Sequence, residues 1–347
     1  MILYKENIDC GNKYRQAYRE GIENLIANLT TESVKKRSEI INGIKNNPEM
    51  YREKLKTMLG WPLNSDGCGN VEEINKILIA KRDEVSIYRL QIKILEIPFY
   101  GLLFVKEDDK KRPLVLVQHG GLGSPEVCGN LLEIGTENYN DIIDRVLKYD
   151  VNVFAPQLLL WRQEFSFDEY TDNGVSYTDA LRRGIDNELK QFGSSITALE
   201  IYCINRAIDY FENQTYVDID KIGMMGMSYG GFYALYTTAI DKRIKCCLSS
   251  SFFNDRIKYN WTDWVWFDSA NTFTDVEVAL LVHPRPLYIC ISDEDEVFDI
   301  NSGIETWNEL NGYLEDDSNM HFIKFKGNHE FIKDDKPIQA FIEDLRR

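Results

Sequence analysis

The sequence predicts an α/β protein with a mostly parallel central sheet, helices on both faces of that sheet and an N-terminal helical extension. Apolar, strand-like runs alternate with helix-like segments over most of the chain, which is the pattern of strands joined by crossover helices. The composition fits this class, because a 347-residue chain with 44% apolar residues can bury one large core plus a smaller appendage. We find no internal repeat and no low-complexity tract in the sequence.

The chain is expected to divide into a helical extension, residues 1–75, and a main domain, residues 76–347. Residues 12–60 are polar, rich in Lys, Glu, Asn and Ile, and have helical spacing that ends at Gly60. Such an extension packs on the main domain or joins copies of the chain into a homo-oligomer. Capping of a substrate is the alternative role.

From Ile77 onward the pattern changes to strict alternation, most clearly in residues 89–94, where Leu90, Ile92 and Ile94 share one face of a strand. These residues predict leading antiparallel strands. Strands and helices are then predicted in turn over 114–118, 137–149, 151–155, 195–212, 221–227, 230–240, 244–249, 286–291, 302–313, 320–326 and 335–345. The helix at 195–212 carries an apolar stripe and is expected to pack on the sheet.

A serine flanked by glycines stands where the strand-like run 221–227 meets the helix-like run 230–240, in the sequence G-M-S-Y-G-G. Because Gly226 and Gly230 have no Cβ atom, the turn can be tight and the helix can pack close to the strand. A serine hydroxyl is a poor nucleophile at neutral pH unless a base takes its proton. The pattern predicts Ser228 as a nucleophile; the alternative is an ordinary turn whose serine caps the helix.

The chain has four histidines, and the three that follow Ser228 are candidates for the base. His283 precedes the strand-like run 286–291 and His321 begins the run 320–326, whereas His329 follows that last run. Catalytic groups collect at the carboxyl ends of strands in open parallel sheets. We therefore predict His329 as the general base. We expect His119 to orient its loop.

An acid that orients the base is expected after the preceding strand, in the segment S-D-E-D-E-V-F-D at 292–299. Asp295 is preferred because it stands just ahead of the apolar pair Val297 and Phe298, which suits a turn pointing inward. Asp293 is the alternative.

An oxyanion formed during acyl transfer needs preorganised N–H donors. The amide of Tyr229, next after the candidate nucleophile, is one expected donor, and the glycine-rich loop after the strand 114–118 offers the second. Gly121 is the preferred second donor, with Gly120 and Leu122 as alternatives.

Together, H-G-G at 119–121, G-M-S-Y-G-G at 226–231, the acidic turn near 295 and G-N-H-E-F at 327–331 resemble the α/β-hydrolase superfamily over roughly residues 85–345. Within it, the stretches 119–126, 191–200 and 250–256 are similar to the bacterial dienelactone hydrolase and acetyl xylan esterase-like branch. Dienelactone hydrolases have a cysteine nucleophile where this chain has Ser228, which favours ordinary ester hydrolysis. The resemblance implies an acyl-enzyme mechanism without a cofactor.

Two segments interrupt the alternation, residues 157–194 and 252–275, and are expected to shape the substrate site. The first includes Arg182 and Arg183 and predicts a partial lid with a polar lining. Aromatic and charged side chains in the second suit a sugar ring, although tryptophans that fill the core would explain the same pattern. The residues predicted to contact a substrate are Trp161, Arg162, Phe253 and Trp264.

These observations predict a serine carboxylesterase that acts on a short acyl ester, with an acetylated carbohydrate as one candidate. One alternative is a serine peptidase of the prolyl oligopeptidase-like type, although the residues ahead of the main domain are too few and too helical for the β-propeller usual there. The other is a catalytically silent binding protein on the same fold. A dinucleotide site is not expected, because G-x-x-G-x-S does not match G-x-G-x-x-G.

Composition narrows the setting in which the chain is expected to work. A formal net charge of −16 repels polyanions, so we do not expect nucleic-acid binding. The seven cysteines are an odd number without metal-binding spacing, which predicts free core thiols, reducing surroundings and no bound metal. Neither a leader nor a membrane span is readable, so we expect a cytoplasmic protein with a small-molecule ester as its substrate.

Overall fold

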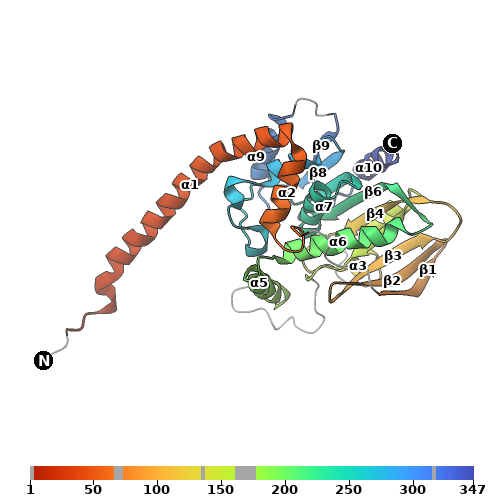
Figure 1. Ribbon diagram of the computed structural model, residues 1–347, viewed down its shortest axis with the longest axis horizontal. Helices are drawn as coiled ribbons and strands as arrows, with labels where there is room; N and C mark the ends of the chain where they lie inside the picture. Colours follow the sequence, from red (N-terminus) through yellow and green to blue (C-terminus); the bar gives the residue numbers. More distant parts are fainter. Residues whose placement is uncertain (1–3, 66–72, 134–136, 161–176, 315–317) are drawn as a thin grey trace.

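The computed structural model describes residues 4–65, 73–133, 137–160, 177–314 and 318–347 (Figure 1). Its strands are β1 Ile74–Arg82, β2 Val85–Ile94, β3 Ile97–Lys106, β4 Arg112–Gln118, β5 Asn152–Pro156, β6 Val217–Met227, β7 Ile244–Ser250, β8 Leu287–Ser292 and β9 Met320–Phe325. Its α-helices are α1 Asn12–Asn46, α2 Pro48–Leu59, α3 Pro125–Cys128, α4 Ile142–Leu147, α5 Tyr177–Lys190, α6 Ile196–Glu212, α7 Tyr229–Ile240, α8 Asp275–Val282, α9 Ile300–Asn311 and α10 Lys336–Arg346. Short 3₁₀ turns are η1 Ile8–Gly11, η2 Thr262–Trp264 and η3 Ser269–Asn271.

The described strands form one nine-stranded sheet in the order β1-β2-β3-β5-β4-β6-β7-β8-β9. β1, β2 and β3 pair antiparallel, and β3 is also antiparallel to β5. All the pairings from β5 through β9 are parallel. The predicted class, a mostly parallel sheet preceded by antiparallel strands, is confirmed.

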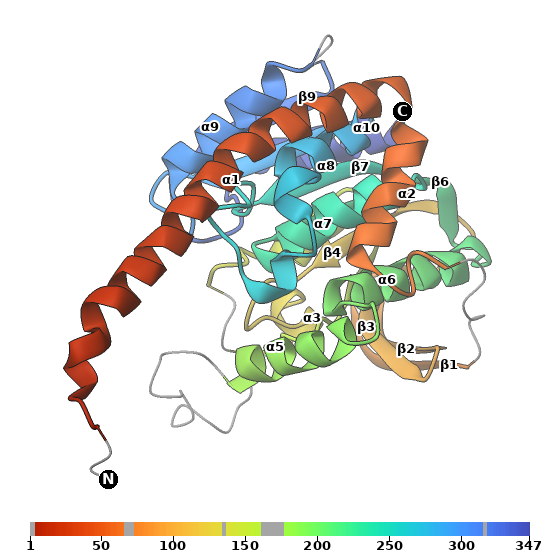
Figure 2. The same ribbon diagram turned by 60° about the vertical axis from the view of Figure 1, so that its left-hand side comes forward.

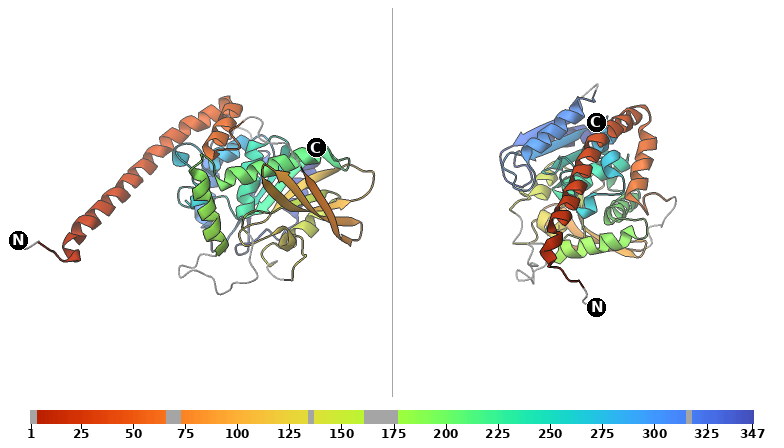
Figure 3. Two further views of the ribbon diagram at one scale, coloured as in Figure 1. Left: turned by 60° about the horizontal axis from the view of Figure 1, so that its bottom comes forward. Right: turned by 90° about the vertical axis from the view of Figure 1, so that its left-hand side faces the viewer.

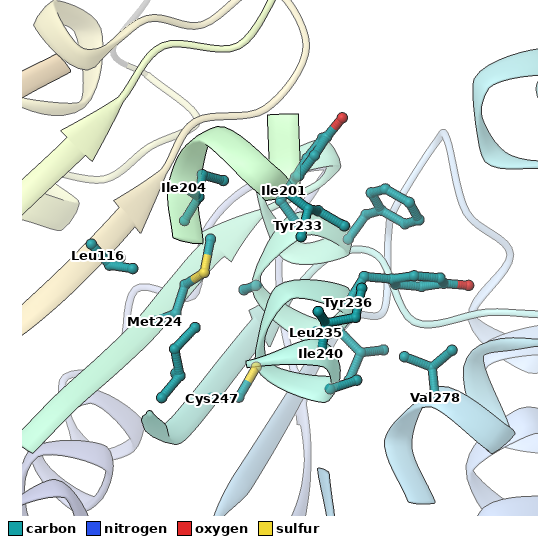
Figure 4. Close-up of a cluster of buried hydrophobic side chains, with 14 of the residues drawn as sticks. Leu116, Ile201, Ile204, Met224, Tyr233, Leu235, Tyr236, Ile240, Cys247 and Val278 are labelled. Atoms are coloured by element: carbon teal, nitrogen blue, oxygen red, sulfur yellow. The ribbon is translucent and has the colours of Figure 1, made fainter. Parts of the chain in front are cut away.

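Helices cover both faces of the sheet because its central strands are apolar on both sides. One cluster of buried side chains joins the sheet to α2, α6, α7, α8 and the second half of α1. In Figure 4, Leu116, Met224 and Cys247 from neighbouring strands meet helical side chains such as Ile204 and Leu235. A second cluster, on the opposite face, joins the strands to α3, α4 and α10.

Three helices were not expected from the sequence, and one of them, α3, has only four residues. The segment 157–194 contains α5, and α8 follows the aromatic loop. All eight residues of α8 are buried, so its sequence D-V-E-V-A-L-L-V has no polar face from which a helical period could be read. Thr274 and Glu277 form a capping box that starts this helix. The helix expected at 137–149 is shorter in the structure, where it forms α4.

The first helix, α1, has two different halves. Its second half packs on the body through buried residues that include Ile40, Ile41 and Ile44, whereas residues 12–29 are exposed throughout. Figures 1 and 3 show that this first half projects away from the body. In the part of the chain that the structure describes, no helix combines the length and the apolar character that crossing a membrane requires.

The cysteines that the structure describes are all free thiols, and five of them are buried: Cys128, Cys203, Cys246, Cys247 and Cys290. Cys10, by contrast, is exposed. Among the described residues, no group of three or more His, Cys, Asp or Glu side chains could hold a metal ion.

Candidate active site

Ser228 lies on a sharp turn between β6 and α7, with φ 58° and ψ −123°. A residue other than glycine at such positive φ costs about 1–3 kcal/mol, so the surroundings must hold it there. The Ser228 N–H donates to the carbonyl of Ser250 over 2.9 Å, and the Ser228 carbonyl accepts from Phe232 N–H over 3.0 Å. A Cβ atom at Gly230 would collide with the Gln118 carbonyl, and one at Gly226 with the backbone of Gly230. The two glycines therefore permit the close packing expected from the sequence.

His329 and Asp295 meet at the carboxyl edge of the sheet, although 33 residues separate them in the chain. His329 Nδ1 lies 2.9 Å from Asp295 Oδ2 and 3.1 Å from Oδ1. Asp295 Oδ1 also accepts backbone N–H groups from Val297 at 2.8 Å and Phe298 at 3.0 Å. If Nδ1 donates to this carboxylate, Nε2 is the imidazole atom left to act as a base.

The alternative acid, Asp293, has a different role. Its Oδ1 accepts the Gly327 N–H at 3.3 Å, and its own N–H donates to the Phe325 carbonyl at 2.9 Å. Asp293 thus connects the ends of β8 and β9. Of the two aspartates considered, the structure brings Asp295 to the imidazole.

Ser228 and His329 line one cavity of about 240 Å³. Gly121 and Tyr229, the residues expected to supply the oxyanion donors, line the same cavity, as do the alternatives Gly120 and Leu122. The structure therefore gathers the candidate nucleophile, base and N–H donors from three separate segments. Only Asp295 stands behind the cavity wall, where its side chain is 3% exposed.

His119 holds the glycine-rich loop in place. Its Nδ1 lies 2.8 Å from the Gly120 carbonyl, and its Nε2 accepts the Leu158 N–H at 2.9 Å. Burial lowers the pKa of His119 to about 4, so the ring is neutral at pH 7. The Gly120 N–H donates to the Tyr139 hydroxyl at 2.9 Å. Tyr139, which no sequence pattern singled out, thus supports the same loop.

Two predicted substrate residues do not reach the cavity. Phe253 is 1% exposed and Trp264 is fully buried, so both belong to the core, as the alternative interpretation of the aromatic segment held. Trp261 lines the cavity instead, with its ring stacked on Tyr229 at a centroid distance of 5.7 Å. The 3₁₀ turn η2 directs Trp264 inward and leaves Trp261 at the cavity. Trp161 and Arg162 lie outside the described residues.

The consecutive arginines of α5 point in different directions. Arg183 lines the cavity, whereas Arg182 is 1% exposed and enters the core. Arg182 Nε contacts Asp263 Oδ2 at 2.6 Å, and Nη1 contacts Glu200 Oε2 at 2.9 Å. Adjacent helix positions differ by about 100°, so only one of the two can face the cavity. Of these two arginines, Arg183 therefore lines the cavity and Arg182 does not.

The candidate site lies in a part of the chain that matches a known protein family. The model of the prolyl oligopeptidase family matches residues 204–344, which include Ser228, Asp295 and His329. A curated Bacillus subtilis protein with the name "Putative hydrolase YtaP" is 34% identical over 110 residues. That alignment covers 29% of this chain and 37% of the relative, so the chain spans little more than a third of the relative's length.

Solved structures of esterases have the same fold. A glucuronoyl esterase from Solibacter usitatus has a TM-score of 0.60 and 12% identity, with 88% of this chain and 93% of the other covered. An acetyl xylan esterase from Thermoanaerobacterium sp. has a TM-score of 0.53 and 15% identity, covering 86% and 93%. A cold-adapted esterase from an Arctic intertidal metagenomic library has a TM-score of 0.55 and 18% identity, covering 79% and 100%. The chain thus has the α/β-hydrolase fold, and its residues 204–344 match the prolyl oligopeptidase family.

Proposed function

We propose that the protein is a serine carboxylesterase that works through an acyl-enzyme. The observation that carries this proposal is one cavity lined by both Ser228, on a strained strand-to-helix turn, and His329, whose Nδ1 is held by Asp295. A nucleophile, a base and an orienting acid in this arrangement are the minimum set for acyl transfer.

In the first half-reaction, His329 takes the proton of the Ser228 hydroxyl as its oxygen attacks the ester carbonyl. The N–H groups of Tyr229 and Gly121 then stabilise the oxyanion of the tetrahedral intermediate. His329 returns the proton to the leaving alcohol, which leaves an acyl group on Ser228. Water repeats the sequence, releases the acid and restores the serine. Throughout, Asp295 stabilises the imidazolium that forms transiently on His329.

The lining of the cavity supports a short, polar ester as the substrate. A volume of about 240 Å³ leaves little room for a long acyl chain. The half-buried indole of Trp261 offers an apolar face, and Arg183 offers hydrogen-bond donors in the same cavity. An apolar face beside donors suits a sugar, so an acetylated carbohydrate is the substrate class we favour. Two of the structural neighbours described above carry names of carbohydrate-active esterases.

A serine peptidase is the second candidate, and the match to the prolyl oligopeptidase family favours it. The same serine, histidine and oxyanion donors would act on a peptide amide, since both reactions pass through a tetrahedral oxyanion. The two candidates differ in leaving group. Rates on matched ester and amide substrates with the same acyl group therefore separate them.

The deciding experiment measures hydrolysis of p-nitrophenyl acetate and p-nitroacetanilide by the wild type, Ser228→Ala and Ser38→Ala. Ser38 lies on α1, outside the cavity, and so serves as the matched serine control. We expect ester hydrolysis to fall by at least about a thousandfold in Ser228→Ala alone. Ester hydrolysis that survives this change would contradict the assignment of the nucleophile. Amide turnover that rivals ester turnover would favour the peptidase, and a wild type inactive on both would favour a binding protein.

A further inference from the structure

The projecting half of α1 carries an apolar surface that no described part of the chain covers. Six large side chains are exposed there by 42–75%: Tyr14, Tyr18, Ile22, Leu25, Ile26 and Leu29. Figure 2 shows this half of the helix extending beyond the body that its second half crosses. An isolated helix of this length is only marginally stable in water, because most helical stability in proteins comes from packing of an apolar face. We therefore expect this apolar surface to pack against a partner.

Four of these six residues, Tyr18, Ile22, Leu25 and Leu29, have the spacing of a coiled coil. Residues 15, 18, 22, 25, 29 and 32 recur at alternating intervals of three and four, the heptad pattern in which two helices pack side chains into each other's gaps. The four inner positions are Tyr18, Ile22, Leu25 and Leu29, and all four are exposed. At about 100° per residue, Ile22 and Leu29 lie on the same side of the helix as the buried Ile40 and Ile44. The apolar faces of the two halves thus lie on the same side of α1, separated by the polar residues Ser33, Lys36 and Arg37, and only the face of the second half is covered by the body.

The two outer positions of this pattern carry opposite charges, Arg15 at the first and Glu32 at the last. If two copies of α1 run antiparallel about an axis between Glu23 and Asn24, each residue i faces residue 47 − i of the other copy. Tyr18 then meets Leu29, Ile22 meets Leu25, and Arg15 meets Glu32, so every inner layer is apolar and each end is an ion pair. A parallel pair would place Arg15 beside Arg15 and Glu32 beside Glu32, which is unfavourable.

The length of the projecting half matches this arrangement. The helix begins at Asn12, and packing on the body begins at Ser33, the first buried residue of α1. In the antiparallel register, Asn12 of one helix lies opposite residue 35 of the other, close to the point at which α1 begins to pack on its own body. A two-fold pair of this kind also closes on itself, as most homo-oligomers do.

We propose that residues 14–32 of α1 form an antiparallel helix pair with a second copy of this chain. Arg37 fixes the position of each helix on its own body, because its Nη1 lies 3.0 Å from both Glu277 Oε1 and Glu309 Oε1. The exposed apolar half is therefore held out in a defined direction. The two bodies attach at opposite ends of the pair.

The first test is sedimentation velocity of the full chain from about 1 to about 100 µM, with the variants Leu25→Glu and Ala27→Glu. Leu25 is an inner position, and Ala27 lies on the opposite side of the same exposed helix. We expect the wild type and Ala27→Glu to be dimers and Leu25→Glu to be a monomer with an unchanged near-UV circular dichroism spectrum. A wild type that stays monomeric at 100 µM overturns the proposal, as does a dimer that survives Leu25→Glu.

The second test addresses the orientation of the pair. Glu32→Arg should weaken the dimer about three- to tenfold in Kd, and Arg15→Glu combined with Glu32→Arg should restore it, because the ion pairs re-form with reversed sign. In a parallel pair, these changes would exchange one like-charge contact for another and leave Kd unchanged. Weakening without restoration by the double variant would therefore overturn the antiparallel register.

Discussion

Asp295 orients His329 because its own carboxylate is fixed. Its Oδ1 accepts two successive backbone N–H groups, from Val297 and Phe298, and its side chain is 3% exposed. A carboxylate held in this way keeps one orientation and accepts the imidazole N–H at 2.9 Å. Asp293 stands two residues away and holds the β8–β9 connection instead. Asp293 and Asp295 thus have different structural roles, although they are only two residues apart in the sequence.

This division of roles predicts different kinetics for two conservative variants. Asp295→Asn should lower kcat for p-nitrophenyl acetate by about a thousandfold or more, because an amide cannot stabilise the imidazolium and favours the wrong tautomer. Asp293→Asn is the matched control and should stay within about tenfold of the wild type. Steady-state kinetics of both variants check this expectation. Equal losses in the two would assign the acid's role to neither residue.

His119 couples stability to pH through its burial. Its folded-state pKa is lowered to about 4 by desolvation, while the unfolded chain has the ordinary value of about 6.5. Between these values the unfolded state binds the proton more readily, so stability should fall as pH drops from about 6.5 toward about 4. The full difference is on the order of 3 kcal/mol. Above about pH 6.5 this destabilisation is absent.

The variant His119→Gln should therefore lose less stability on acidification than the wild type. Urea unfolding at about pH 7 and about pH 5 gives the two free-energy differences to compare. Because other groups titrate in both proteins, the difference between the proteins is the relevant quantity. Equal changes in both would show that protonation of His119 does not oppose folding.

At the scale of elements, a buried charge cluster ties α5 to the rest of the site. Arg182 on α5 contacts Glu200 on α6 and Asp263 on η2, and its Nη2 donates to the Tyr233 hydroxyl on α7 at 2.7 Å. The Tyr229 hydroxyl donates to Asp263 Oδ1 at 3.2 Å. The cluster therefore connects the wall that carries Arg183 with the start of the nucleophile helix. Inside a low-dielectric core these charges are stable only as a complete set.

Removing one charged side chain from this cluster should lower the stability of the protein. Asp263→Asn leaves Arg182 with less compensating charge, so we expect the free energy of unfolding to fall by about 3 kcal/mol in urea titrations. Asp255→Asn, an exposed acid in the same loop, is the control and should change it by less than about 0.5 kcal/mol. A neutral effect of Asp263→Asn would mean that Glu200 alone balances the buried guanidinium.

At the scale of the whole molecule, the two halves of α1 have different roles. Ile40, Ile41 and Ile44 complete the core over α8, whereas residues 12–29 are exposed throughout. Arg37 joins the body through Glu277, whose pKa is raised by its burial. Loss of the second half would uncover core residues, but loss of the first half removes no packing between the residues that the structure describes.

Two truncations should separate these roles. Deletion of residues 1–30 is expected to leave kcat/KM for p-nitrophenyl acetate within about twofold, because none of the described residues among them lines the cavity. Deletion of residues 1–46 should produce an unstable or insoluble protein, because three core isoleucines are lost. Activity and thermal unfolding of both forms provide the check. Lost activity in the shorter deletion would revive the capping role considered for the extension.

The sequence by itself determined the features that depend on neighbouring residues. Alternating apolar runs specified the parallel sheet, and Gly226 and Gly230 specified the sharp turn at Ser228, because only residues without Cβ fit there. Placing His329 after the last strand was enough to put it at the edge of the sheet where Ser228 lies. These inferences hold because the direction of a parallel strand determines at which edge of the sheet the residues after it lie.

Tertiary structure decided which side chain of a segment faces the cavity. Asp295 rather than Asp293 meets His329, Trp261 rather than Trp264 lines the wall, and Arg183 lies at the cavity while Arg182 enters the core. These choices depend on charges and packing contributed by elements distant in sequence, such as Glu200 beside Arg182. The fully buried α8 was missed for the same reason, since a helix surrounded by core has no polar face to reveal its period.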